Sequence, residues 1–151
     1  MFAPSFFIPL AVLAPSLLIF LGRGPITSPN RSVLGAMESI GRLSVFFLSI
    51  FYLVAIKDLL DVIAAAVMGV LLILYYLCWI RYFRKGREEI LLYQPLGFLP
   101  IPMALLTIGY LLLSAVILDS VLMLISTLLF AAGHIPLQWK AYRKAQLKKP
   151  A

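Results

Sequence analysis

The chain has 151 residues, of which 63% are apolar and only 13% are charged. This composition excludes an ordinary soluble domain, where about a quarter of the residues are charged, and it indicates a membrane protein. The formal net charge is +7, but the lysines and arginines lie at the ends of apolar runs and form no basic patches with interleaved aromatic residues. We therefore expect anionic lipid headgroups as partners and no nucleic acid.

Five apolar segments each approach the roughly 20 residues that a helix needs to cross about 30 Å of hydrocarbon. They cover residues 2–21, 33–56, 62–80, 96–118 and 121–139, and a basic tail follows over residues 140–151. The first segment has no basic residue before it, so we interpret it as a retained helix, bent by Pro9 and Pro15, and not as a secretory signal. The sequence predicts an all-α fold, a single polytopic transmembrane bundle of five helices.

The lysines and arginines predict the orientation, because loops rich in these residues stay in the cytoplasm. Five alternating crossings place every lysine and arginine except Lys57 on one side. The other side receives the N-terminus, Asp58, Asp61, Asp119 and very short connections, which exclude a receptor ectodomain. We therefore expect the N-terminus outside, the C-terminus inside, short outer loops and basic cytoplasmic loops, in a cytoplasmic or plasma membrane.

The connections contain several helix signals. Ser28 is placed to cap a helix that has Pro29 at its first position. Residues 88–99, which precede Pro100 and Pro102, either cross with the fourth segment or lie partly in the membrane interface.

Other residues at the segment ends have both a structural and a functional interpretation. Asp58 and Asp61 either cap the third segment, which is the simpler explanation, or bind a cation. Asp119 is expected to cap the fifth segment. An aromatic cluster indicates an inner membrane belt or, alternatively, a binding platform; it consists of Tyr75, Tyr76, Trp79, Tyr82 and Phe83.

The second segment is too short to cross on apolar residues alone. Residues 43–56 cover about 21 Å at about 1.5 Å per residue, so the crossing has to include Arg42 and Glu38. These two residues are four apart and can pair on one helix face. Counted from Lys57, Arg42 lies about 22 Å deep, and His134 lies at a similar depth when counted from Asp119. Glu38, Arg42 and His134 are therefore a candidate polar pocket.

Two interpretations of this pocket remain open. Ionisable residues inside a membrane are costly and often functional, so Arg42 would hold a carboxylate or phosphate while His134 donates a hydrogen bond or shuttles a proton. In the simpler interpretation Arg42 reaches back to the headgroups, Glu38 pairs with it, and His134 is an interface residue. Elsewhere, Ala65 and Gly69 are four residues apart, a spacing that favours close helix packing.

The sequence predicts no catalytic residue, metal site or cofactor. It has one cysteine, Cys78, and one histidine, and it contains no phosphate-binding loop or nucleophile elbow. It favours a non-enzymatic integral membrane protein that serves as a subunit or accessory component of an assembly, with a protein partner or as a homo-oligomer. The alternative is a small carrier or binding protein for an anionic or amphipathic solute, with the pocket facing the cytoplasm. A membrane enzyme that modifies lipid headgroups is a third possibility, which needs a nucleophile or metal that we do not identify.

Overall fold

The structure is a computed structural model, and it describes residues 3–23, 32–86, 90–95 and 100–147. Its elements in chain order are β1 (Ala3–Pro4), α1 (Phe7–Arg23), α2 (Val33–Phe51), β2 (Leu53–Val54), α3 (Leu59–Arg84), α4 (Ile90–Tyr93), α5 (Pro102–Ile117) and α6 (Val121–Leu147). The predicted all-α character is confirmed, and the two strands form only a two-residue antiparallel pair. The predicted cap at Ser28 lies outside the described residues.

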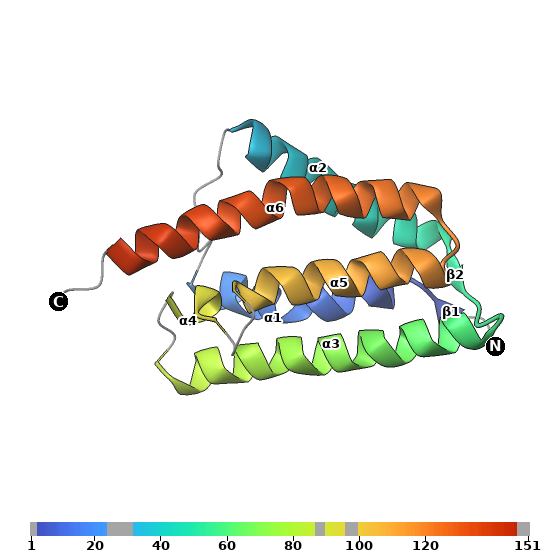
Figure 1. Cartoon of the computed structure of the whole chain (residues 1–151), viewed down its shortest axis with the longest axis horizontal. Helices are drawn as coiled ribbons and strands as arrows, with labels where there is room; N and C mark the ends of the chain where they lie inside the picture. The colour runs from blue at the N-terminus through green and yellow to red at the C-terminus, as the bar shows by residue number, and fades with distance from the viewer. Residues whose placement is uncertain (1–2, 24–31, 87–89, 96–99, 148–151) are drawn as a thin grey trace.

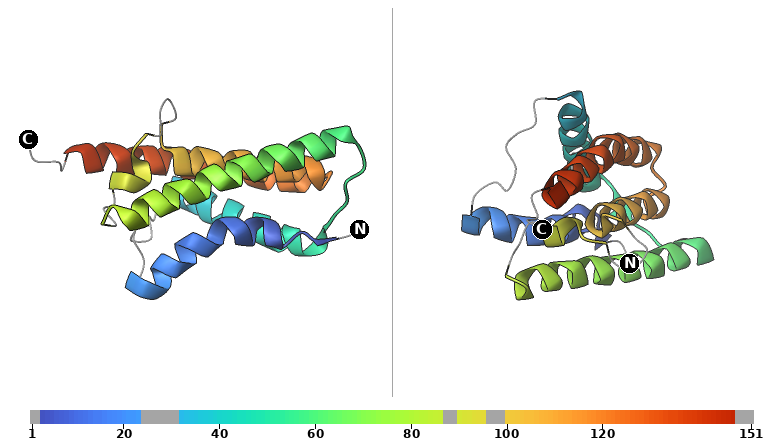
Figure 2. Two further views of the ribbon diagram at one scale, coloured as in Figure 1. Left: turned by 90° about the horizontal axis from the view of Figure 1, so that it is seen from below. Right: turned by 60° about the vertical axis from the view of Figure 1, so that its left-hand side comes forward.

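The helices α1, α2, α3, α5 and α6 run in alternating directions between the two ends of the molecule (Figure 1). One end holds β1, β2 and the turn from α5 to α6, and the other end holds α4 and the C-terminus. In the interior α2 packs on α6, α6 on α5 and α5 on α3, while α1 contacts α2, α3 and α5. Figure 2 shows that α1 bends along its length, as expected for a helix with Pro15 inside it.

Three helices, α2, α3 and α6, are long and apolar enough to cross a membrane, and α5 is a shorter apolar helix. Large apolar side chains cover their outward faces, among them Phe47, Ile63, Ile73 and Leu128. An apolar surface of this extent is unfavourable in water and suits hydrocarbon. The fold therefore supports the prediction of a membrane protein.

α2 ends at Phe51, so the predicted continuation to residue 56 is wrong. The hydroxyl of Ser5 is shared between the carbonyls of Ser49 and Tyr52, with Oγ 2.7 Å from the Tyr52 oxygen. Ser5 thus satisfies one of the last carbonyls of α2 and the carbonyl of its C-cap residue without another helical turn, and the chain continues into β2, which pairs with β1. The same pairing keeps the N-terminal residues extended, so α1 begins at Phe7 and not at residue 2.

Helix caps fix the connections at this end of the molecule. Asp58 accepts a hydrogen bond from the backbone nitrogen of Asp61 (3.0 Å), which confirms the predicted cap of α3. The predicted cap of α6 by Asp119 is wrong, because Ser120 accepts from the nitrogen of Met123 (3.2 Å) instead. Asp119 has a φ of 49° and pairs with Lys57, whose Nζ lies 3.1 Å from Oδ2. This ion pair joins the two connections.

The other predicted bounds also shift. α5 begins at Pro102 and not at residue 96: Ile101 has a φ of 41°, outside the helical region, and a following proline disfavours the helical conformation. Residues 96–99 lie outside the described residues. α3 extends beyond residues 62–80 at both ends, and α6 continues through Pro136 to Leu147, so the start of the predicted basic tail is helical. Hydropathy marks the stretch inside hydrocarbon, and a helix does not have to end there.

The predicted aromatic belt is directed partly inward. Tyr75, Trp79 and Tyr82 are buried, and the rings of Trp79 and Tyr82 meet edge to face with centroids 5.7 Å apart. The hydroxyl of Tyr75 donates to the carbonyl of Val12 on α1 (2.8 Å). These aromatic residues therefore hold helices together, and only part of the cluster remains at the surface.

The short helix α4 is attached to the bundle from both sides. Its Leu91, Leu92 and Tyr93 are buried, and it contacts α6 and the end of α3. Arg81 of α3 donates to the carbonyls of Leu91 (3.1 Å) and Gln94 (3.0 Å). The described part of residues 88–99 thus packs on the protein and satisfies its carbonyls through a basic side chain.

Two glycines bring α2 and α6 into backbone contact. A Cβ atom on Gly41 would lie 2.6 Å from the Cα of Phe130, and one on Gly133 would lie 2.9 Å from the Cα of Glu38. Real Cβ atoms essentially never approach other atoms this closely. A side chain at either position therefore forces the two helices apart.

We expect Gly133→Ala to lower the free energy of unfolding by about 1–3 kcal/mol, because the added methyl group overpacks the contact between α2 and α6. Gly69→Ala is the matched control, since a Cβ there meets nothing within 4 Å. The control should be neutral or stabilising by up to about 1 kcal/mol. Thermal unfolding in detergent, followed by circular dichroism, measures both. Equal effects of the two substitutions would contradict the proposed close contact.

Candidate functional site

The contact between α2 and α6 brings the three residues of the predicted pocket together. Glu38 and Arg42 lie one turn apart on α2, and His134 follows Gly133 on α6. The Oε1 atom of Glu38 accepts a hydrogen bond from a terminal nitrogen of Arg42 and lies 2.9 Å from Nδ1 of His134. One carboxylate oxygen thus joins a cation on its own helix to an imidazole on the facing helix.

Phe130 is a fourth member of the cluster. Its ring stacks on His134, with centroids 4.7 Å apart and an interplanar angle of 22°. The guanidinium carbon of Arg42 lies 5.6 Å from the centre of the same ring, within the range of a cation–π contact. Sequence reasoning missed Phe130, although its position four residues before His134 places both on one face of α6.

The members of the cluster differ in exposure. The side chains of Glu38 and His134 are 17% and 13% exposed, whereas that of Arg42 is 48% exposed. The carboxylate and the imidazole are therefore enclosed between α2 and α6, and the guanidinium is partly open. The guanidinium of Arg42 forms an ion pair with Glu38 and a cation–π contact with Phe130.

Arg42 lies at the middle of α2, which changes the depth derived from the sequence. α2 runs from Val33 to Phe51, so Arg42 is about 14 Å from either end by helix rise. The predicted depth of 22 Å assumed a helix that continued to Lys57, and that assumption fails because α2 ends at Phe51. If α2 spans the membrane, the headgroups lie beyond both helix ends, far from Arg42. Its positive charge would then be compensated by the Glu38 carboxylate and the Phe130 ring.

A small cavity adjoins Arg42 between α1, α2, α5 and α6. Its volume is about 40 Å³. Its lining residues are Pro9, Val12, Leu13, Arg42, Val45, Thr107, Leu111 and Phe130. The hydroxyl of Thr107 is already bonded to the carbonyl of Met103 (2.8 Å). A water molecule occupies about 30 Å³ of liquid, and pockets for drug-sized solutes measure roughly 300–1,000 Å³, so this cavity has room for about one water.

The predicted helix-packing residues lie elsewhere. Ala65 is partly buried against the core, whereas Gly69 is exposed on α3 with no atom near enough to contact a Cβ. Close packing within the chain is made by Gly41 and Gly133, which sequence reasoning did not select. Each glycine is next to a residue of the polar cluster in the sequence, and this position was the only indication in the sequence that the helices approach closely there. A role of Ala65 and Gly69 in association stays a prediction.

The described residues contain no group of three histidine, cysteine, aspartate or glutamate side chains arranged to hold a metal ion. Comparison of the chain with protein families, with curated proteins and with solved structures finds no match. The interpretation of the cluster therefore depends on its geometry.

We expect Glu38→Leu to lower the free energy of unfolding by about 1.5–3 kcal/mol, because it removes the acceptor shared by Arg42 and His134. The double variant Glu38→Leu/Arg42→Leu should recover most of this loss, since it leaves no unpaired guanidinium in the bundle. Unfolding in detergent of the wild type, both single variants and the double variant gives the coupling free energy. Strictly additive effects would show that the two side chains do not stabilise the fold as a pair.

Proposed function

We propose that this chain is a multi-pass membrane protein that acts without catalysis, as a subunit or accessory component of a membrane assembly. Two features support this proposal. The ionisable side chains between the helices are occupied with one another, and the cavity beside them has a volume of only about 40 Å³. The outward faces of the helices are broad and apolar, which leaves them as the surfaces for interaction.

Gly69 is the observation that carries the proposal. A glycine inside a helix costs about 1 kcal/mol relative to alanine. Gly41 and Gly133 have a reason within the chain, because each makes room for the facing backbone, whereas Gly69 faces open space. A second helix packed against α3 from another protein chain would use that space, since small residues let helices approach closely in membranes.

We also propose that five helices cross the membrane, with the N-terminus outside and the C-terminus in the cytoplasm. The alternating directions of the long helices support this topology (Figure 1). The end with β1 and β2 carries Lys57 and three aspartates, whereas the opposite end carries the exposed Arg84, Lys85, Lys140, Arg143 and Lys144. Basic residues favour the cytoplasmic side. With 17 and 16 residues, α1 and α5 are about 25 Å long, which requires slight local thinning of the bilayer.

A carrier or binding protein for an anionic or amphipathic solute is the second candidate. The partial exposure of Arg42, which lines the cavity, favours it. This function requires the cavity to enlarge several-fold and Arg42 to leave Glu38. Solute binding would need the guanidinium, whereas assembly would not. A double variant Glu38→Leu/Arg42→Leu that folds and still joins its assembly would therefore support the accessory role over the carrier.

We expect Gly69→Leu to release this chain from its assembly, because the larger side chain occupies the space that a neighbouring helix would fill. Val67→Leu is the matched control: it enlarges another exposed residue of α3, about 200° further round the helix at 100° per residue. Native electrophoresis of mildly solubilised membranes measures the size of the complex. An unchanged complex with Gly69→Leu would remove the main support for the proposal.

The topology predicts how single cysteines react in a Cys78→Ala background. A maleimide that cannot cross membranes should label cysteines at Phe7, Leu59 and Val121 in intact cells. Cysteines at Lys85 and Gln146 should react only after permeabilisation. The five positions are exposed, and each lies in or beside a helix end. The opposite labelling would reverse the orientation, and a mixed result would change the number of crossings.

A further inference from the structure

Two serine hydroxyls between α2 and α6 lack the partners that other hydroxyls in the bundle have. Ser49, Thr107, Ser114 and Thr127 all donate to carbonyls of their own helices, at 2.6–2.8 Å. Ser44 on α2 and Ser126 on α6 have no hydrogen bond within the described part of the chain. Because lipid tails offer no hydrogen bonds, an unpaired hydroxyl inside a membrane is unfavourable.

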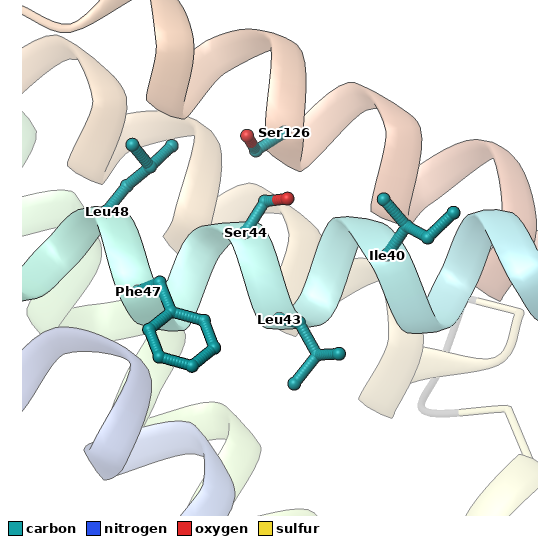
Figure 3. Close-up of a pocket in the computed structure, with 6 residues that line it drawn as sticks. All are labelled: Ile40, Leu43, Ser44, Phe47, Leu48 and Ser126. Atoms are coloured by element: carbon teal, nitrogen blue, oxygen red, sulfur yellow. The ribbon is translucent and has the colours of Figure 1, made fainter.

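Both serines line an open apolar groove. Its volume is about 380 Å³, and its lining residues are Ile40, Leu43, Ser44, Phe47, Leu48 and Ser126. Figure 3 shows Ser44 pointing from α2 toward α6, with Leu43 and Phe47 on the other side of α2. Ile40, Leu43 and Phe47 are spaced three and four residues apart and are exposed, so they form a ridge on α2 that is one wall of the groove.

The depth of Ser44 limits what can occupy the groove. Ser44 lies about 10 Å from the nearer end of α2, at Phe51, by helix rise. A lipid whose headgroup stays at the membrane surface presents only its tail at this depth, and the tail cannot pair with a hydroxyl. The occupant therefore has to bring a polar group to this level of an otherwise apolar surface.

A second copy of this chain meets that requirement. Copies inserted in the same orientation are related by a two-fold axis along the membrane normal, so every residue near the axis meets its partner at its own depth. A hydroxyl both donates and accepts, so two serines satisfy each other. The ridge of each copy is also one wall of its groove, so that it can pack into the groove of the other copy.

We propose that the groove between α2 and α6 is the interface of a homodimer, in which Ser44 of each copy hydrogen-bonds to a serine hydroxyl of the other. This inference deepens the proposed function by naming one partner, a second copy of this chain. It uses a surface distinct from the face of α3 that carries Gly69, so the two can be tested separately.

The test is disulfide crosslinking of the full chain in native membranes, in a Cys78→Ala background. Ser44→Cys changes little in size and should give a covalent dimer on oxidation. Leu128→Cys is the control: it is exposed on α6, about 200° from Ser126, and should remain monomeric. In bilayers, energy transfer between labelled copies should show that Ser44→Ala weakens dimerisation by about threefold for each hydrogen bond lost.

The outcomes separate this inference from the proposed function. A dimer at residue 44 and none at residue 128 supports the inference, whatever Gly69→Leu does. A crosslink through Gly69→Cys without one at residue 44 overturns the inference and leaves the accessory role intact. A crosslink from residue 44 to a different protein also overturns the homodimer. Absence of any crosslink at residue 44, with the dissociation constant unchanged by Ser44→Ala, overturns it as well.

Discussion

The backbone contact between α2 and α6 at Gly41 and Gly133 is the constraint on which the arrangement of the bundle depends. Without it the carboxylate of Glu38 would not reach His134, because a Cβ on Gly133 would meet the backbone of Glu38 itself. The enclosure of that carboxylate then positions Arg42, whose charge is met on the same oxygen and on the ring of Phe130. Close packing and polar pairing are thus linked here, since separating the helices would take the His134 imidazole away from the Glu38 carboxylate and the Phe130 ring away from the Arg42 guanidinium.

The same requirement for satisfied polar groups explains the irregular end of α2. A chain that leaves a helix near the membrane exposes carbonyls that lipid cannot satisfy. Ser5 and the pairing of β1 with β2 take up some of these groups, and Lys57 joins Asp119 across the adjacent connection. At the opposite end Arg81 meets the carbonyls of α4. The first end is thereby closed by side chains that are distant in the sequence, and the second by a side chain 10 and 13 residues from its two acceptors.

These features separate what the sequence predicts from what it does not. Helical character and the apolar nature of the helices follow from composition, and the pairing of Glu38 with Arg42 follows from their spacing on one helix. The juxtaposition with His134 was inferred from depths counted from Lys57 and Asp119. In the structure His134 lies beside Glu38, whereas Arg42, one turn further along α2, lies beside Phe130. The depth shared by Arg42 and His134 was therefore wrong, since it assumed that α2 continued to Lys57, whereas α2 ends at Phe51. The glycine contact, Phe130 and the role of Ser5 each depend on a facing segment, which periodicity within one helix does not reveal.

The interior of this bundle is largely occupied by its own stabilisation, and this directs attention to its outer surfaces. The buried carboxylate, the imidazole and most interior hydroxyls are paired within the chain, and the cavity beside Arg42 is close to the size of a single water. Within the described residues, the features that no contact inside the chain explains include Gly69, which is exposed on α3, and the two serines that line the groove between α2 and α6. In hydrocarbon, where apolar contact alone gives little specificity between helices, small residues and hydroxyls are the groups that select a partner. These residues support the proposal that the protein acts through contact with other chains in the membrane.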